Sequence, residues 1–508
     1  MSGTQNFLKY LAVLLATWIL TGCFTVGPDY QKPEVNWLDK WETDFYGQIG
    51  GPEEQARVDL RFWWRLFDDP VLNQLIELAR QENPSLRIAG LRILESRAAL
   101  GIASGLHYPQ VQVATGAIDY ANTKSSGESA QSDVVYSTGL SVGWELDFWG
   151  RFKRSIESAD AAFFASIANQ QDLQVLLSAQ VADLYYAYRT TLLRIDIAEK
   201  NAEIQKRSFE ITTKLYESGE QSELDLQQAK TLYMSTLSGI PDLEITRTQL
   251  RNALCAILRR PPGGLPELDD RAQDLPEVDS VIVQDVPASL LMRRPDIRTA
   301  AAQVAAQSAQ IGIAKADLYP SISLSGSVGY SGSTLSLGIG PSFTWNLFNY
   351  GRIKNNVRVQ DARLQQAIEN FQNVVLQAAR EIDDAAISVV KTREQRGPQS
   401  ESTRAAERSL ELANARYREG YADFQRVIDA QRAVATQSER EIVNNSSHIS
   451  AVVDFYKALG GGWLEMSIEQ LIPAATRDSM ESRTNWGDLL RDPIPVETDS
   501  LNSTPKVK

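Results

Sequence analysis

The sequence predicts an α+β membrane protein in which one strand-and-helix unit occurs twice. Three observations support this fold class: an internal repeat, strands with alternating apolar residues, and very long helices with coiled-coil spacing. The segment Trp144–Arg151 returns as Trp345–Arg352, an offset of 201 residues. Upstream, Tyr108-Pro109 returns as Tyr319-Pro320 at an offset of 211. Two similar halves in one chain indicate a pseudo-symmetric assembly.

The repeat divides the 508-residue chain into six segments. In chain order we expect a lipoprotein signal peptide at 1–22, an extended N-terminal segment at 23–83, a first repeat at 84–260, a linker at 261–293, a second repeat at 294–460 and a C-terminal tail at 461–508. Length alone would suggest about three domains, but the duplication favours one interleaved body.

Composition disfavours several classes of protein. The net charge of −13 and the pI near 5.0 give no basic surface for nucleic acid. With only two Cys and two His, a metal or thiol enzyme is poorly supported. His107 and His448 have no catalytic motif around them, so we expect no catalytic residues, no metal site and no cofactor.

The N-terminus reads as an export signal. Lys9 precedes an apolar run at 11–20 that is too short for a transmembrane helix of about 20 residues. The run ends in Leu20-Thr21-Gly22-Cys23, which looks like a bacterial lipobox and makes Cys23 the predicted lipid attachment site. In bacterial lipoproteins, which this start resembles, a residue other than Asp after the Cys permits sorting to the outer membrane; here it is Phe24. An ordinary signal peptide with a chance cysteine is the alternative.

Four strand candidates occur in two pairs. They lie at about 110–120, 136–148, 321–331 and 335–347. In each, apolar residues alternate with small or polar ones over about 10 residues, which is the pattern of a transmembrane β-barrel strand. A soluble sandwich is the alternative.

Aromatic residues at the strand ends favour the membrane interpretation. We expect Trp144, Trp149, Trp345 and Tyr350 to form an interfacial aromatic girdle. Four strands cannot close a barrel, since eight is the usual minimum. Open strand edges are not tolerated in lipid. Either the strands lie outside the membrane, or several chains pool their strands in a shared barrel.

Very long helices follow each strand pair. In the first half we expect a helix at 84–106, an outgoing helix at 151–218 and a returning helix at 220–259. In the second half, apolar positions keep spacings of four and three from Leu364 to Val389 and again from Phe424 to Leu459. This spacing is coiled-coil periodicity.

Each pair of long helices turns at a glycine. Gly219 and Gly420 are natural left-handed C-caps for the outgoing helices. An outgoing helix of roughly 65 residues spans about 100 Å, and the two shorter helices together nearly match it. Stacked end to end, they would leave an equatorial belt midway along the long helix, formed by 261–287.

Several motifs resemble those of the outer membrane factor lipoproteins. They cover about 23–471 and are, in order, Cys23 with Gly27-Pro28-Asp29-Tyr30 and Lys32-Pro33, then Trp63-Trp64-Arg65-Leu66-Phe67-Asp68-Asp69-Pro70, Leu290-Leu291-Met292-Arg293-Arg294-Pro295-Asp296-Ile297, Leu318-Tyr319-Pro320 and the two Gly-Arg turns. The resemblance implies a TolC-like homotrimer with four transmembrane strands per chain in one outer-membrane β-barrel and a long α-helical periplasmic barrel.

The resemblance also implies function and partners. Such proteins are passive exit ducts of tripartite efflux systems for small molecules or drugs. Their partners are a periplasmic adaptor protein and an inner-membrane transporter, which we expect here to be of the RND type. The outer-membrane component of a type I protein secretion system is the alternative function.

The resemblance suggests where a periplasmic gate would lie. In the family, acidic residues near the start of the last long helix face the axis, and Asp429 falls at that place, one turn after Gln425. The first-half counterpart of Asp429 is Gln228, with Asp225 a weaker candidate nearby. The difference suggests that only one hairpin lines the aperture. The tips at Gly219 and Gly420 are the expected adaptor contacts. A solvated surface acid and plain helix capping are the alternatives.

Overall fold

The computed structural model describes residues 25–35, 59–123, 131–268, 271–278 and 291–495. Cys23 and the signal peptide lie outside the described residues. So do residues 124–130 between the first two predicted strands, part of the 261–293 linker and the last residues of the tail.

The chain divides into two compact units. The strand unit takes its described residues from Met1–Glu34, Arg92–Ile167 and Arg298–Asn373. The hairpin unit takes its described residues from Val35–Leu91, Ala168–Ile297 and Val374–Lys508. Each unit thus contains corresponding parts of both repeats, so the halves are interleaved rather than arranged as successive domains.

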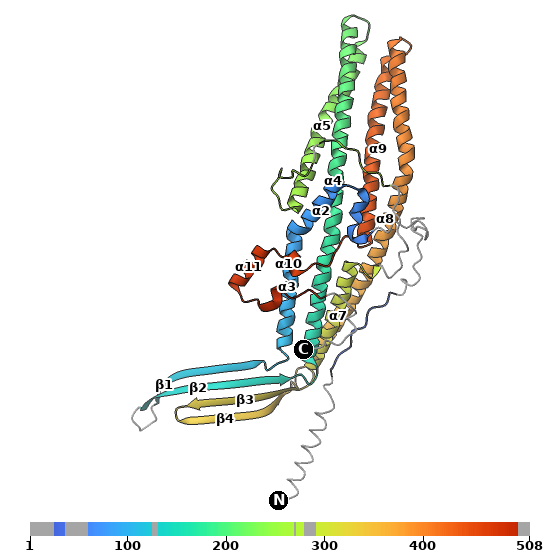
Figure 1. The fold of residues 1–508 in the computed structure, drawn as a ribbon. Coiled ribbons are helices and arrows are strands. Elements are labelled where there is room, and N and C mark those ends of the chain that lie inside the picture. The colour runs from blue at the N-terminus through green and yellow to red at the C-terminus, as the bar shows by residue number, and fades with distance from the viewer. Residues whose placement is uncertain (1–24, 36–58, 124–130, 269–270, 279–290, 496–508) are drawn as a thin grey trace. The chain divides into compact units, whose positions relative to one another are not determined.

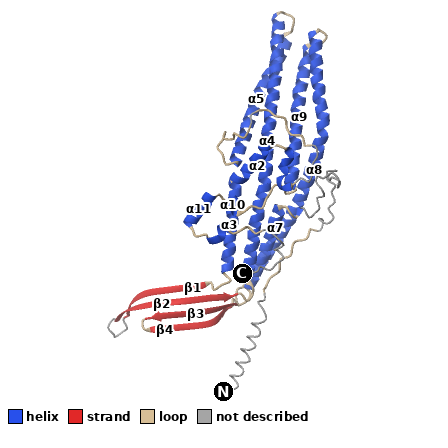
Figure 2. Ribbon diagram, viewed as in Figure 1, coloured by secondary structure: helices blue, strands red, loops and turns tan. Residues whose placement is uncertain are grey.

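The strand unit contains one antiparallel sheet (Figures 1 and 2). Its strands are β1 (Val111–Thr123), β2 (Gln131–Leu146), β3 (Ser321–Ser331) and β4 (Thr334–Thr344), in the order β1-β2-β3-β4. The two predicted strand pairs are therefore joined through β2 and β3. Because the sheet is open, β1 and β4 are its edges among the described strands.

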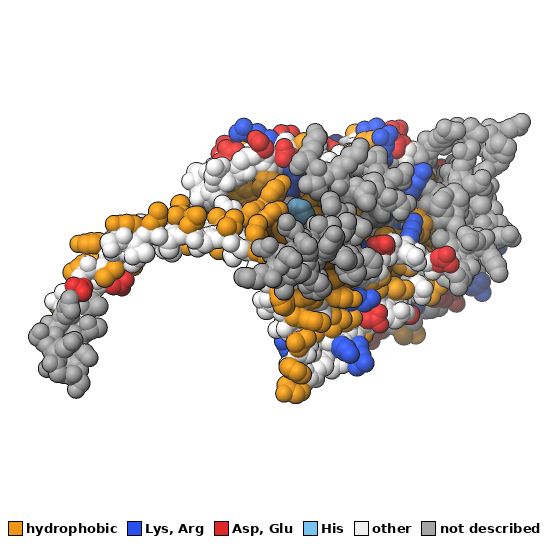
Figure 3. Space-filling view, turned by 90° about the horizontal axis from the view of Figure 1, so that it is seen from below, with side chains coloured by type: hydrophobic (Ala, Val, Ile, Leu, Met, Phe, Trp, Pro, Cys, Tyr) orange, Lys and Arg blue, Asp and Glu red, His pale blue; other side chains and the backbone are white. Residues whose placement is uncertain are grey.

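One face of the sheet is apolar, as the alternation predicts. Directly opposed residues such as Leu140 and Val328, or Val328 and Leu337, lie on the same face. Large side chains of this face are exposed, among them Ile118, Leu337 and Ile339. Figure 3 shows hydrophobic side chains gathered along the strands. Such a face requires an apolar surrounding, because its exposure to water is unfavourable.

Strand ends differ from the prediction. β2 starts five residues earlier than expected, and β4 stops at Thr344 instead of continuing to 347. The reason is the turn into the next helix, where Leu347 N donates to Trp345 O at 3.1 Å instead of joining the ladder.

The long helices form as predicted. α3 spans Pro84–Gly105, α4 Arg151–Glu217, α5 Glu223–Ile257, α7 Pro295–Ala316, α8 Arg352–Arg418 and α9 Phe424–Ala458. The outgoing helices α4 and α8 have 67 residues each and the returning helices α5 and α9 have 35. α5 begins three residues later than expected because Ser222 caps it.

Among the described residues, no helix is both long and apolar enough to span a membrane.

The coiled-coil seam is buried over part of the predicted length, and Leu364, Ile368 and Ile442 are only half-buried. In α8 the buried seam positions are Phe371, Val375, Ala378, Ile382, Ala385 and Val389. Along α9, Ile428, Gln431, Ile449, Val452 and Tyr456 are also buried. Cys255 is buried and free, as expected for a small apolar residue.

Two short helices meet the ends of the returning helices within the hairpin unit. The Asn83 side chain donates to Ile257 O at 3.0 Å, which joins the end of α5 to the start of α3. The equivalent Arg294 donates to Ala458 O at 2.6 Å, joining α9 to α7. These contacts confirm end-to-end stacking at both junctions.

Short elements replace some of the predicted extended structure. Leu60–Phe67 is a 3-10 helix (η3), although the sequence predicted an extended segment there, and Trp63 and Trp64 of η3 are buried. α2 runs from Pro70 to Glu82 and is capped by Asp69. The tail forms α10 (Ile468–Leu471), α11 (Ala474–Arg483) and η4 (Gly487–Leu490), which the sequence did not predict.

Candidate functional site

The ends of the two helical hairpins are closed by equivalent glycine turns. Gly219 and Gly420 both have φ near +78°, a backbone conformation that glycine adopts without strain. Past them, Glu220 N donates to Leu215 O at 2.8 Å and Tyr421 N donates to Arg416 O at 2.9 Å. The predicted C-caps are confirmed, whereas adaptor binding at these tips stays a prediction.

The hairpins are joined near their ends by an apolar cluster. Phe424, Val427 and Ile428 of α9 are buried against Ala229 of α5, with Tyr417 packed at the side. The corresponding first-half residues are Glu223, Leu226 and Gln227. The two hairpins are therefore unequal at this level, as the sequence mismatch suggested.

Polar contacts link the same ends. Gln221 Nε2 donates to Tyr417 Oη at 3.0 Å, and Gln431 Nε2 donates to Ser208 Oγ at 2.7 Å. Burial raises the pKa of Tyr417, so its hydroxyl stays protonated. These two links were not predicted from the sequence. Both repeats have a tyrosine and a serine at these positions, because Tyr417 and Ser208 correspond to Tyr216 and Ser409. This repetition could have marked the residues as candidates. Helical periodicity alone does not show which helices come into contact.

Asp429 lies on the exposed face of α9, opposite the buried cluster. Its carboxylate accepts a hydrogen bond from Gln425 Nε2 at 2.9 Å and lies 3.7 Å from Arg432 Nη1. The Asp429 side chain is 59% exposed. The structure thus brings the predicted pair Gln425 and Asp429 together on a solvent-facing surface.

Asp225 has a structural explanation. It sits in the first turn of α5, where Ser222 Oγ donates to Asp225 Oδ2 at 2.6 Å and accepts from Asp225 N at 3.2 Å. Such reciprocal bonding stabilises a helix start. Gln228 is half-buried, and its Oε1 is a buried atom without a hydrogen bond among the described residues.

The predicted girdle residues gather at the two strand-to-helix turns of the strand unit. Trp144 Nε1 donates to His107 O at 3.2 Å, and its repeat equivalent Trp345 donates to Leu318 O at 3.1 Å. Both therefore use their indole N–H within the chain. Membrane contact by their rings stays a prediction.

The other two girdle residues differ from one another. Trp149 stacks on Tyr319, with ring centroids 4.5 Å apart, and donates to Pro320 O at 2.8 Å. Its equivalent Tyr350 is fully exposed and has a φ of +50°. The turn at Trp149 is thus covered by Tyr319 and Pro320 of the second repeat. The equivalent turn at Tyr350 is exposed.

The N-terminal segment is fixed at the first of these turns. Val26 N donates to Trp149 O at 3.0 Å. The buried Arg154 side chain binds the Asp29 carboxylate at 2.7 Å and approaches the carbonyl oxygens of Val26 and Gly27 at 3.4 and 3.5 Å. The described residues that follow Cys23 are therefore held against the start of α4.

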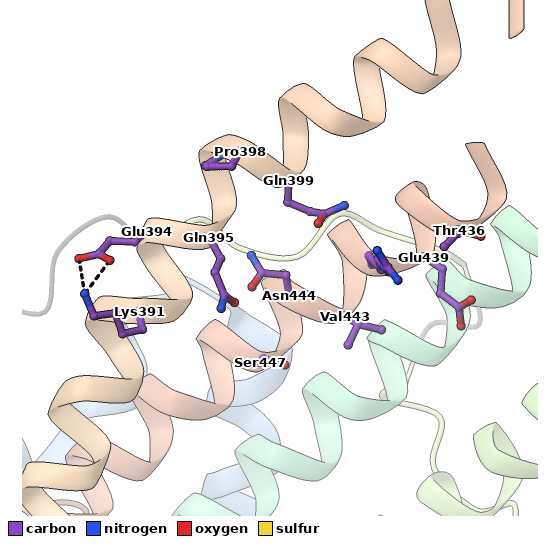
Figure 4. A pocket seen from close by; sticks show the side chains of 11 residues that line it. Lys391, Glu394, Gln395, Pro398, Gln399, Thr436, Glu439, Val443, Asn444 and Ser447 are labelled. Carbon is purple, nitrogen blue, oxygen red and sulfur yellow. Dashed lines mark hydrogen bonds and ion pairs between the residues drawn. The ribbon is translucent and has the colours of Figure 1, made fainter. Parts of the chain in front are cut away.

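A groove lies beside Pro398 in the hairpin unit. It has a volume of about 830 Å³ and lies between α8 and α9 (Figure 4). Lys391 and Glu394 form an ion pair of 2.8 Å at its edge, and Gln399 Nε2 donates to Gln437 O at 3.2 Å. Pro398 lies inside α8 and cannot donate to the preceding turn of that helix.

His448 is held by hydrogen-bonding partners inside the hairpin unit. His448 is buried, its Nδ1 lies 2.9 Å from Thr392 Oγ1 and its Nε2 lies 3.2 Å from Val278 O. Burial lowers the pKa of His448, so it is neutral at pH 7. In the described part of the chain, no group of three or more His, Cys, Asp or Glu side chains could hold a metal ion.

Comparison with known proteins identifies similar chains. Residues 75–258 and 286–461 match the family described as "Outer membrane efflux protein". The cation efflux system protein CusC of Escherichia coli O157:H7 is 30% identical over 457 residues, which cover 87% of this chain and 96% of CusC. The toluene efflux pump outer membrane protein TtgC of Pseudomonas putida is 30% identical over 477 residues, covering 90% of this chain and 96% of TtgC.

A solved structure has the same fold. The outer-membrane channel OprN superimposes with a TM-score of 0.79 at 32% identity, covering 86% of this chain and 99% of that one. The fold is therefore that of the TolC-like outer-membrane channels, as predicted.

Proposed function

Because the chain belongs to the outer membrane efflux protein family, we propose that it is the outer-membrane exit duct of a tripartite efflux system. The observation that carries this proposal is the match of both repeats to the family on a chain with a four-stranded apolar sheet and paired 67-residue helices. An inner-membrane transporter of the RND type would supply energy, and a periplasmic adaptor would join it to the duct. The cargo would be small molecules or drugs.

The assembly we propose is a homotrimer. β1 and β4 are open edges among the described strands, and open edges are not tolerated in lipid. Three copies would supply about twelve strands, enough to close a barrel. The two repeats per chain would then approximate sixfold symmetry around one lumen.

The periplasmic aperture would be lined by α9. Asp429 is exposed, and three copies would place three such carboxylates around the axis, where they repel one another and attract cations. The links Gln221–Tyr417 and Ser208–Gln431 would hold the hairpins in the closed arrangement. The tips at Gly219 and Gly420 would contact the adaptor.

The outer-membrane anchor would be a lipid on Cys23. The support is the lipobox-like sequence together with the fixed position of Val26 to Asp29 at the start of α4. We expect the parent chain to incorporate radiolabelled palmitate and the Cys23→Ala chain not to. Equal labelling of both would refute the anchor.

Deletion of the gene tests the function. We expect greater susceptibility to drugs or other small toxic molecules without loss of any secreted protein, and restoration by the plasmid-borne gene. Unchanged susceptibility together with loss of a secreted protein would contradict the efflux proposal and favour protein secretion.

A further inference from the structure

The two strand-to-helix turns of the strand unit differ in charge. Residues 145–158 contain three acids and three cations, whereas the equivalent residues 346–359 contain three cations and no acid. These cations are Arg352, Lys354 and Arg358, and Arg358 stands where the first repeat has Glu157. We call residues 345–359 the basic turn. A local excess of three positive charges, in a chain of net charge −13, indicates an anionic partner.

The first turn neutralises its cations within the chain. Arg151 Nη1 lies 3.8 Å from Glu145 Oε1 and 3.7 Å from Asp317 Oδ1. The equivalents of these two acids, at the offsets of 201 and 211, are the uncharged Asn346 and Leu106. The cation that corresponds to Arg151 in the basic turn therefore has neither acid available.

The start of the outgoing helix differs in the same direction. At the first turn, the Asp147 carboxylate accepts hydrogen bonds from Phe152 N at 3.0 Å and Lys153 N at 2.8 Å. Its equivalent in the basic turn is Phe348, which is 90% exposed and offers no acceptor. The positive end of the α8 helix dipole thus lacks the carboxylate that α4 has, and it adds to the charge of the three cations.

The cations of the basic turn are open to solvent. Arg352, Lys354 and Arg358 are all exposed. Within the described part of the chain, no carboxylate forms an ion pair with any of them. Arg358 Nη1 donates to Asn355 Oδ1 at 3.0 Å, which is a neutral acceptor. Their charges are therefore available to an anion from outside the chain.

Exposed aromatic rings directly precede these cations. Trp345 is 50% exposed, Phe348 is largely exposed and Tyr350 is fully exposed. They follow β4, whose apolar side chains Leu337 and Ile339 are also exposed. Aromatic rings lie at the headgroup level of membranes, and the long stems of Lys and Arg let their charges reach the phosphates. The order apolar strand, aromatic residues, cations matches the order hydrocarbon, interface, phosphate.

We propose that the basic turn binds the phosphate headgroups of anionic phospholipids in the periplasmic leaflet of the outer membrane. The periplasmic side follows because the long helix α8 leaves the sheet at this turn. Each cation near an anionic surface favours binding by about fivefold, which is about 1 kcal/mol. The inference rests on the proposed function, since it requires the sheet to lie in the outer membrane.

Competition between two lipids tests the basic turn in the full chain. The detergent-extracted chain is incubated with equal amounts of phosphatidylglycerol and phosphatidylcholine of the same acyl chains, and native mass spectrometry measures the ratio bound. We expect the parent chain to prefer phosphatidylglycerol, less so as salt increases. Arg352→Gln with Lys354→Gln should lower this preference by up to about 25-fold. Arg151→Gln with Lys153→Gln, the same charge change at the equivalent positions, should alter it little because acids already offset those cations.

Other results would overturn the inference. These are a parent chain without headgroup preference, an equal loss in both double variants, or displacement of phosphatidylglycerol by millimolar inorganic phosphate, which would indicate a site for free anions. Dissociation of the oligomer in Arg352→Gln with Lys354→Gln, at unchanged lipid preference, would assign the basic turn to a contact between copies.

Reconstitution separates this inference from the proposed function. Insertion of the parent chain into liposomes without headgroup preference would refute lipid binding by the basic turn and leave the membrane location of the sheet intact. Failure to insert into liposomes of either lipid would contradict the membrane location and, with it, both proposals.

Discussion

Gly312 of α7 lies against the side chain that holds the N-terminal segment, and its repeat equivalent Gly101 faces open space. A Cβ at 312 would lie 2.7 Å from Arg154 Cγ and 3.0 Å from its Nε. A Cβ at 101 would meet no heavy atom within 4 Å in the described part of the chain. The two Gly→Ala substitutions therefore share the gain in helix propensity, and only Gly312→Ala adds a steric conflict.

The expected magnitudes follow from these two effects. Replacing glycine by alanine inside a helix stabilises it by about 1 kcal/mol. Overpacking costs about 1–3 kcal/mol, and Arg154 cannot retreat without losing bonds of 2.7 Å to Asp29 and 2.6 Å to Glu157. Gly101→Ala should stabilise by up to about 1 kcal/mol, whereas Gly312→Ala should destabilise by about 0–2 kcal/mol.

Thermal unfolding of the two detergent-extracted variants, followed by circular dichroism, measures this difference. Proteolysis provides a second readout, because displacement of Arg154 in Gly312→Ala should expose residues 25–35 to cleavage and leave them protected in Gly101→Ala. Equal midpoints with equal protection would refute the contact between Gly312 and Arg154, as would a more stable Gly312→Ala.

Three further predictions concern charged residues of the hairpin unit. Asp429→Asn should reduce the cation preference of the reconstituted channel in planar bilayers, and Glu407→Gln on α8 should not; equal effects would exclude a special role for Asp429. Arg294→Met should destabilise the chain by about 2–4 kcal/mol, because Ala458 O and two carboxylates lose their buried donor. Asn83→Ala, at the equivalent junction, should destabilise it by only about 1–2 kcal/mol. A larger loss of stability in Asn83→Ala than in Arg294→Met would contradict the junction assignment. Burial raises the pKa of Asp172 to about 6, so the folded state is penalised as pH rises from about 4 to above 6. Asp172→Asn should therefore stabilise by up to about 2–3 kcal/mol at pH 7.5 and by almost nothing at pH 4, and a pH-independent difference in unfolding temperature would contradict this account.

Most of the fold could be predicted from the sequence because it depends on local patterns. Alternation located the four strands, the 4–3 spacing located the seams, and glycine marked the turns at Gly219 and Gly420. The end-to-end stacking of helices followed from their lengths. It is confirmed by the contacts of Asn83 with Ile257 and of Arg294 with Ala458.

The remaining features depend on tertiary contacts that no local pattern reports. η3 forms because Trp63 and Trp64 are buried, although their segment has no steady period. Pro241 lies inside α5 and Pro398 inside α8, although proline lacks the N–H that a helix interior uses. For the site, the sequence placed Gln425 and Asp429 one turn apart. The hydrogen bond between Asp225 N and the capping residue Ser222, and the Gln221–Tyr417 hydrogen bond, became apparent only from side-chain geometry.

The mass of the detergent-extracted chain is the most direct test of the shared barrel. The 508-residue chain has a mass of 56.4 kDa. Native mass spectrometry should give a protein mass of three mature chains, because four strands with two open edges cannot close a barrel alone. A stable particle with the mass of one chain would contradict the assembly and, with it, the exit-duct function proposed for this protein.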